Sequence, residues 1–200
     1  MKKSIFSFAI LATLVVFAIS NLSAQTVYSI DAATSKSIWL GKKVQGQHTG
    51  GITIKSGEIT VDKDLKITKA EVVIDMSSIT CTDLTDATYN EKLVGHLKSA
   101  DFFDVAKFPE AKFVLTGSVK IQKGYTILKG KLTIKDVTLP FELKAMIAIN
   151  NDEFKSFSNL VIDRSKFGVK YGSGSFFDEL GDNTIYDEFE LNLALSAKKK

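Results

Sequence analysis

An alternation of apolar and polar residues with a period of two runs through most of this chain, and it constrains the fold more than any other feature. In residues 137–149 every odd position is apolar, whereas the even positions include Thr138, Glu142 and Lys144. Successive side chains of a β-strand point to opposite faces, so this stretch has one apolar face and one mixed face. The pattern therefore predicts a β-strand that is buried on one side.

The same alternation recurs along the chain and predicts an all-β fold. The segments predicted as strands are Ser37–Val44, Ile52–Val61, Ala70–Met76, Ala111–Ile121, Leu128–Ile134, Val137–Ile149, Phe154–Arg164 and Phe189–Ser196. In the second of these the parity slips by one residue at Ser56-Gly57, which predicts a β-bulge there.

The connections between these strands are short, as at residues 122–124 and 150–152, and short connections favour hairpins in up-and-down order. Strands with one apolar face must either close into a barrel or pack as two sheets, and periodicity alone does not separate the two. One segment departs from the pattern: residues 89–98 carry Leu93 and Leu97 four positions apart. We expect a short inserted helix there that packs an apolar edge on the sheet.

Residues 1–24 have the layout of a secretory signal peptide. Met1-Lys2-Lys3 is a positive start, residues 5–19 are apolar apart from Ser7 and Thr13, and Ala24 offers a small residue at a cleavage point. A membrane anchor is the alternative, but an apolar run of about 15 residues is shorter than the roughly 20 needed to span a bilayer. We therefore expect export, with residues 25–200 forming a single domain.

Charge and cysteine content narrow the range of partners. Two of the 26 basic residues belong to the predicted signal, and the 24 that remain nearly balance the 23 acidic residues. This balance argues against nucleic acid or an anionic membrane surface as the main partner. Cys81 is the single cysteine, so no intramolecular disulfide can form. A small, partly buried residue is favoured there over a reactive thiol or a bridge between chains.

The residues that usually perform catalysis are few. Beyond the predicted signal there are two histidines, His48 and His96, and the one cysteine, and no pair of them has metal-ligand spacing. No paired acid and base is visible. We therefore expect no metal, no cofactor and no enzymatic activity; a weaker alternative is an enzyme that acts on a lipid headgroup through His48 or Arg164. His96 is interpreted as a capping or packing residue.

The predicted inward faces point to the barrel interior as the site of function. Small residues recur on them, namely Ala70, Ala111, Gly117, Gly130 and Ala145. A mid-strand glycine weakens a strand, so it indicates either sharp curvature or space for an apolar ligand. Barrels of eight strands have interiors just large enough to hold one small ligand. In that case the bulky inward residues Trp39, Met76, Phe113, Phe141 and Phe189 form the wall.

A few polar residues are candidates for the interior or its mouth: Lys42, His48, Asp163 and Arg164. Arg164 shares the parity of Leu160 and Ile162 and is expected to point inward. It would contact a ligand headgroup or form a buried ion pair with Asp163 or Asp187, and the sequence leaves both open.

Several motifs resemble the YceI-like family, in family order and over nearly all of residues 25–200. They are His48-Thr49-Gly50-Gly51, Ser56-Gly57-Glu58-Ile59, residues 73–79 (VIDMSSI), residues 96–104 (HLKSADFFD) followed by Lys107-Phe108-Pro109, residues 130–135 (GKLTIK) and residues 162–169 (IDRSKFGV). The run from Leu97 to Pro109 is the most specific. The sequence departs from the family at Lys135-Asp136, where a glycine commonly follows the strand, and in the loop from Tyr171 to Tyr186.

The resemblance implies a lipocalin-like, eight-stranded antiparallel up-and-down barrel with a short inserted helix, in the bacterial periplasm. It also implies binding of a polyisoprenoid, an isoprenoid quinone or a similar long-chain amphiphile in an internal tunnel, and it brings no catalytic residues. The residues expected to bind the lipid are Trp39, His48, Met76, Phe113, Gly130, Leu132, Phe141, Ile162, Arg164 and Phe189. The alternative is a structural or partner-binding barrel with a filled core. A homodimer and a transient contact with a membrane or a partner protein are left open.

Overall fold

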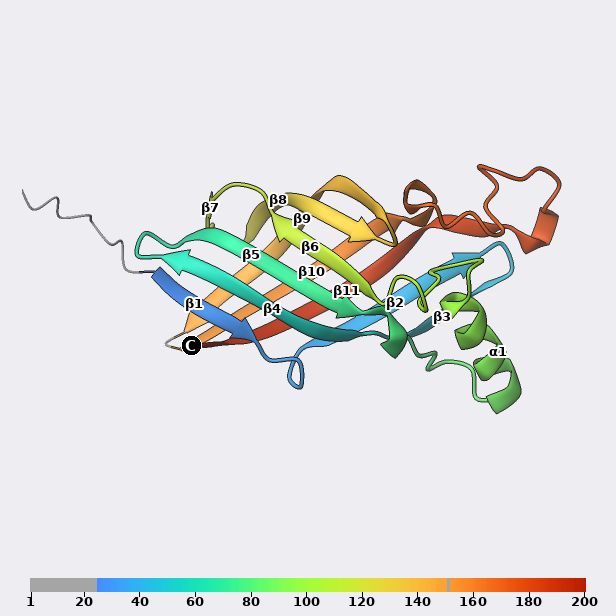
Figure 1. Cartoon of the computed structure of the whole chain (residues 1–200), viewed down its shortest axis with the longest axis horizontal. Coiled ribbons are helices and arrows are strands. Elements are labelled where there is room, and N and C mark those ends of the chain that lie inside the picture. The colour runs from blue at the N-terminus through green and yellow to red at the C-terminus, as the bar shows by residue number, and fades with distance from the viewer. Residues whose placement is uncertain (1–24, 151) are drawn as a thin grey trace, which may run out of the picture.

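A computed structural model describes residues 25–150 and 152–200 (Figure 1). The predicted signal peptide, residues 1–24, lies outside these described residues. None of the helices in the described ranges is both long enough and apolar enough to cross a membrane.

The described chain is built mainly from β-strands. They are β1 (Gln25–Ile30), β2 (Lys36–Lys43), β3 (Gly46–Gly51), β4 (Thr53–Asp62), β5 (Lys66–Asp75), β6 (Glu110–Leu115), β7 (Val119–Lys120), β8 (Tyr125–Ile134), β9 (Val137–Asn150), β10 (Glu153–Asp163) and β11 (Ile185–Lys199). The helices are α1 (Ala87–Lys98) and the short 3-10 turns η1 (Met76–Ser78), η2 (Arg164–Phe167) and η3 (Gly181–Asn183). Asp86 begins α1 by accepting a hydrogen bond from the backbone N–H of Tyr89 at 3.0 Å.

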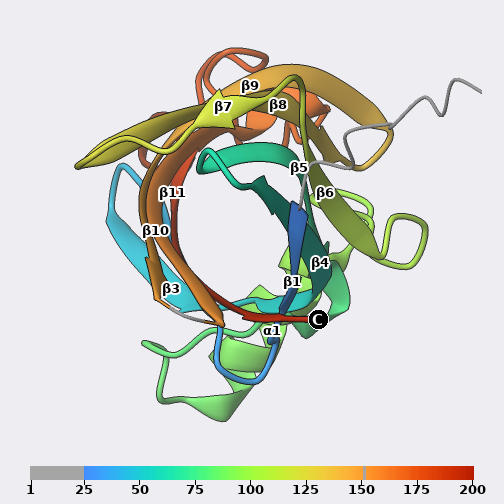
Figure 2. The ribbon, with the colours of Figure 1, turned by 90° about the vertical axis from the view of Figure 1, so that its left-hand side faces the viewer.

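The sheet closes on itself. Antiparallel pairing runs in the order β1-β4-β5-β6-β8-β9-β10-β11, and β1 then pairs with β11. This closed ring of eight strands, seen end-on in Figure 2, confirms the predicted barrel and excludes a two-sheet sandwich. The full strand order also confirms the up-and-down arrangement. Strands β2 and β3 do not interrupt this order, because they extend β1 and β4 beyond the ring.

The β2–β3 hairpin lengthens the barrel at one end. Ile30 of β1 pairs with Ala197 of β11, and Lys36 of β2 pairs with Ala194 of the same strand. Strands β1 and β2 therefore lie one after the other along β11. The β2–β3 hairpin, α1 and residues 168–184 all lie at the end of the barrel opposite the C-terminus (Figure 1).

Three local features differ from the sequence predictions. The predicted strand Ala111–Ile121 is broken, because β6 ends at Leu115 and Gly117 adopts a φ of 80° in an exposed turn. Gly117 is therefore not an inward, mid-strand residue, and that prediction is wrong. A bulge is present in β4 but lies at Lys55, since Ile54 pairs with Ile74 and Ser56 with Val73. Strand β1 was not predicted.

The buried apolar side chains form two clusters. One includes Tyr28, Ile67 and Phe154 and lies toward the end of the barrel where the C-terminus lies. The other includes Met76 and Ile162 and lies toward α1. Cys81 is buried and free, as expected for a small packing residue.

Candidate binding cavity

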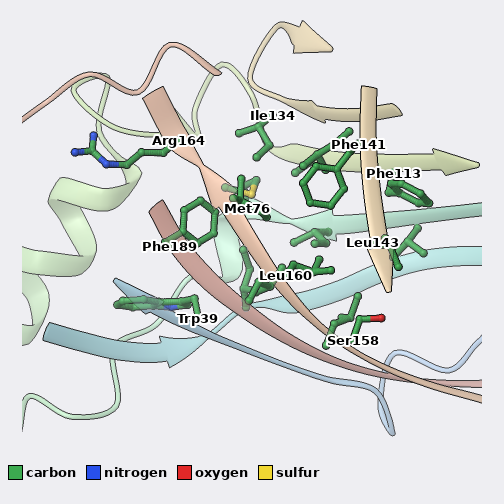
Figure 3. A pocket seen from close by; sticks show the side chains of 18 of the residues that line it. Trp39, Met76, Phe113, Ile134, Phe141, Leu143, Ser158, Leu160, Arg164 and Phe189 are labelled. Carbon is green, nitrogen blue, oxygen red and sulfur yellow. The ribbon is translucent and has the colours of Figure 1, made fainter. Parts of the chain in front are cut away.

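The barrel encloses an apolar cavity of about 340 Å³, which is within the usual range for small-molecule sites. Its lining runs from Ile67 and Phe154 in one cluster to Trp39 and Arg164 at the α1 end. Figure 3 shows side chains from several strands turned toward this space. The inward faces of the alternating strands therefore surround a space that their own side chains do not fill.

Every residue predicted to bind a ligand, except Gly130, lines this cavity. These residues are Trp39, His48, Met76, Phe113, Leu132, Phe141, Ile162, Arg164 and Phe189. The structure thus brings together side chains that are spread over most of the chain. Their contact with a lipid stays a prediction.

Gly130 has a different role from the predicted one. A Cβ atom at this position would lie 2.4 Å from Cζ of Phe113 and 2.5 Å from the carbonyl oxygen of Val114. The space beside Gly130 is therefore filled by the Phe113 ring and the neighbouring strand. Among the other small inward residues, Ala70, Ala111 and Ala145 do line the cavity.

Trp39 is held in place at the α1 end of the cavity. Its indole Nε1 donates a hydrogen bond to the carbonyl oxygen of Thr80 at 3.0 Å. The segment that contains Thr80 runs along β3, where the backbone N–H of Thr80 donates to Gly51 O at 3.0 Å and that of Thr82 to Thr49 O at 2.9 Å. The chain after η1 therefore continues the barrel wall before it reaches α1.

Arg164 fastens two segments together at the same end. Its guanidinium is buried and donates hydrogen bonds to the carbonyl oxygens of Val169 (2.8 Å), Ile185 (3.0 Å) and Tyr186 (3.2 Å). One carboxylate oxygen of Asp187 lies 3.6 Å from Nη2. Burial lowers the pKa of this guanidinium, and the negative charge of Asp187 opposes that effect. The structure therefore contains the buried ion pair with Asp187, and contact of Arg164 with a ligand headgroup stays a prediction.

Asp163 does not point into the cavity but stabilises η2. Its Oδ1 accepts hydrogen bonds from the backbone N–H of Ser165 at 3.0 Å and from the Ser165 hydroxyl at 2.6 Å. Burial alone would raise the pKa of this carboxyl, but the Ser165 bonds and the Lys166 ammonium lower it.

Helix α1 and the loop that follows η2 cover the same end. Leu93 and Leu97 of α1 line the cavity, which confirms that the helix packs an apolar edge on the barrel. The His96 ring meets the rings of Tyr171 and Phe102 edge-on, with centroids 4.4 Å and 5.0 Å apart. His96 is thus a packing residue, as predicted.

The departure from the family pattern at Lys135 has a structural consequence. Lys135 adopts a φ of 55°, in the left-handed region that favours glycine. Its Nζ donates a hydrogen bond to the carbonyl oxygen of Phe102 at 3.1 Å. The lysine therefore ties the β8–β9 turn to the segment after α1, a contact that glycine cannot make.

The sequence predictions did not include the inward hydroxyl groups of β10. Ser156 and Ser158 of β10 line the cavity between Phe154 and Leu160. Both serines share the parity of these apolar neighbours. The alternation in the sequence therefore already indicated that their side chains point inward. Ser158 pairs with Leu193 of β11, which pairs with Ser37 of β2. The three positions therefore form one row across the barrel wall.

His48 lies beside the Asp83 carboxylate, with Nδ1 2.9 Å from Oδ2. Burial would raise the pKa of the Asp83 carboxyl, but hydrogen bonds from Thr49 N–H, the Cys81 thiol and His48 lower it to about 2. The carboxylate is consequently ionised at neutral pH. His48 is therefore oriented by a fixed negative charge.

Comparison with known proteins relates the chain to one family. The sequence profile of the YceI-like domain matches residues 28–197. Protein YceI of Salmonella arizonae is 36% identical over 98 residues, which are 48% of this chain and 47% of that protein. The alignment therefore spans about half the length of this curated relative.

Two solved structures share the fold. BcnA of Burkholderia cenocepacia superposes with a TM-score of 0.65 and 26% identity, over 84% of this chain and 99% of that one. A polyisoprenoid binding domain from Saccharophagus degradans, implicated in plant cell wall breakdown, superposes with a TM-score of 0.59 and 14% identity, over 86% of this chain and 98% of that one. At that low identity the second comparison supports the fold alone.

Proposed function

The chain belongs to the YceI-like family, and on that premise we propose that it binds a long-chain apolar lipid inside its barrel. The ligand class is a polyisoprenoid, an isoprenoid quinone or a similar amphiphile. The protein carries or stores this lipid in the periplasm after loss of residues 1–24.

The observation that carries this proposal is the apolar cavity inside the barrel. Burial of apolar surface contributes roughly 25 cal/mol per Å², so an elongated hydrocarbon chain gains free energy along the whole lining. Polar lining residues, including Lys42, Gln47 and His48, come from the β2–β3 hairpin at the α1 end. This distribution suits an amphiphile with its chain in the barrel and its polar group near the hairpin.

Lipid uptake by the delipidated protein tests the proposal. The protein is incubated with a polyprenol or with a prenylated quinone and examined by native mass spectrometry. We expect one bound lipid per chain. Failure of the wild-type protein to retain either lipid would overturn the proposal.

A matched pair of tryptophan variants locates the bound lipid. Leu143 lines the cavity and retains some exposure there, whereas Lys144, next along β9, faces outward. Leu143→Trp should fill the cavity and lower lipid affinity at least tenfold while the barrel still folds, and Lys144→Trp should leave uptake unchanged. In a filled core Leu143→Trp would instead cost about 1–3 kcal/mol of stability by overpacking. Such a loss, together with no lipid uptake by the wild type, supports the structural barrel.

Fractionation of the native host tests the location. We expect the protein in the periplasmic fraction with Gln25 as its first residue. A cytoplasmic protein that retains Met1 would contradict export.

A further inference from the structure

Three side chains with metal-binding atoms converge where the segment after η1 runs along β3. They are His48 of β3 and Cys81 and Asp83 of that segment, and one ligand atom from each lies within 4.8 Å of the others. We propose that His48, Cys81 and Asp83 bind a divalent transition-metal ion of the Zn²⁺ type. This inference goes beyond the lipid function: His48 also lines the cavity, but Cys81 and Asp83 do not belong to its lining.

The distances suit a tetrahedral ion. His48 Nδ1 lies 2.9 Å from Asp83 Oδ2, and Cys81 Sγ lies 3.1 Å from Asp83 Oδ1. Zinc binds imidazole nitrogen, carboxylate oxygen and thiolate sulfur at about 2.0–2.3 Å, which places neighbouring ligand atoms roughly 3.5 Å apart. Small side-chain rotations are therefore enough to convert the hydrogen-bonded trio into a coordination shell.

The chemistry of the donors selects the class of ion. A thiolate and a carboxylate together balance the charge of a divalent cation, and imidazole adds a neutral nitrogen. Sulfur and nitrogen ligands favour zinc and neighbouring transition metals, whereas Mg²⁺ and Ca²⁺ prefer oxygen alone. Asp83 is exposed, which gives the ion a path from solvent and leaves a fourth position for water.

The backbone around the trio is held in place without an ion. The hydrogen bonds of Thr80 and Thr82 to β3 fix the segment against His48. Asn90 of α1 donates through Nδ2 to the carbonyl oxygens of Cys81 at 3.0 Å and Leu84 at 2.9 Å. The backbone N–H of Thr49 donates to Asp83 Oδ1 at 3.0 Å. Such supporting contacts orient metal ligands and raise metal affinity.

A bound ion would join β3 to the segment that leads into α1. Because the ion binds the folded protein, it stabilises the fold in proportion to the logarithm of its concentration. The ion would therefore reinforce the α1 end of the barrel, where the cavity is covered.

Cobalt spectroscopy on the protein without a histidine tag tests the site. Cys81 is the only cysteine, so a thiolate-to-cobalt charge-transfer band on addition of Co²⁺ can arise from this residue alone. We expect the band in the wild type, its loss in Cys81→Ser and its displacement by Zn²⁺. The wild-type spectrum needs no variant, so the test holds even if a substitution impairs folding.

Equilibrium dialysis with Zn²⁺ supplies a second measurement. His48→Gln should weaken Zn²⁺ binding at least tenfold, whereas His96→Gln, which removes the other histidine, should leave it unchanged. Circular dichroism without metal checks that each variant is folded. Absence of the cobalt band in the wild type, or equal Zn²⁺ affinity in the wild type, Cys81→Ser and His48→Gln, would overturn the proposal.

Discussion

The ring of Phe113 on β6 lies against the bare backbone of Gly130 on β8, so that a Cβ atom on this glycine would lie 2.4 Å from Cζ of the ring. The carbonyl oxygen of Val114 blocks the same space from the backbone side, at 2.5 Å. A glycine that was predicted to leave room for a ligand therefore leaves room for an aromatic side chain, and Phe113 in turn forms part of the cavity wall.

Substitution of Gly130 by alanine should destabilise the barrel. The methyl group collides with a ring and with a main-chain oxygen, and overpacking of this kind typically costs about 1–3 kcal/mol. Gly95→Ala is the matched control, because Gly95 lies in α1 with nothing within 4 Å of the added atom. There we expect a gain of up to about 1 kcal/mol from helix propensity. Urea unfolding measures both, and an unchanged midpoint for Gly130→Ala would contradict the packing role.

The two glycines show where parity alone fails. Gly117 and Gly130 both fall on apolar parity positions, yet Gly117 lies in a turn with a positive φ and Gly130 lies under a ring. Alternation predicts which face a residue occupies within a strand. It contains no information on where a strand breaks or on which neighbour fills the space above a glycine, because both depend on pairing across strands.

Pairing across strands also explains the other features that the sequence did not predict. The barrel closes through β1, whose six residues alternate poorly and pair with β11 from the far end of the chain. His48 and Asp83 are 35 positions apart and meet only because the segment after η1 pairs with β3. By contrast, Trp39, Phe141 and Ile162 were placed on the cavity wall correctly, since strand parity alone determines their direction.

Removal of the Arg164 side chain should be strongly destabilising. Arg164→Met keeps much of the apolar volume but leaves the carbonyl oxygens of Val169 and Ile185 without their donor and the Asp187 carboxylate without its ion-pair partner. Loss of one partner from a buried ion pair typically costs about 3–5 kcal/mol.

Thermal unfolding of Arg164→Met and Lys166→Met provides the comparison. Lys166 is exposed and pairs with Asp163 at 3.2 Å, so its removal should cost less than about 1 kcal/mol. A similar small effect for Arg164→Met would show that the guanidinium does not hold the start of β11.

Stability at acid pH should depend on Asp163. Because hydrogen bonds from Ser165 and the charge of Lys166 lower its pKa in the folded protein, the carboxylate stabilises the fold above its unfolded pKa of about 3.9. That contribution is lost as the pH falls through the lower, folded pKa. Urea unfolding at neutral pH and below pH 4 should therefore show a smaller acid-induced loss in Asp163→Asn than in the wild type. Equal losses in the two proteins would exclude this carboxylate as a contributor.

Removal of the Ser37 hydroxyl should not lower stability, in contrast to the losses expected for Gly130→Ala and Arg164→Met. Its buried Oγ has no hydrogen-bond partner among the described residues, and an unpaired buried hydroxyl costs free energy in the folded state. Ser37→Ala should therefore be neutral or stabilising by about 1 kcal/mol. Thr49 is the matched contrast, because its hydroxyl donates to the carbonyl oxygen of Trp39 at 2.6 Å; Thr49→Val should cost about 1 kcal/mol. Urea unfolding distinguishes the two signs, and a clear loss of stability in Ser37→Ala would show that this hydroxyl has a partner, such as a buried water, inside the barrel wall.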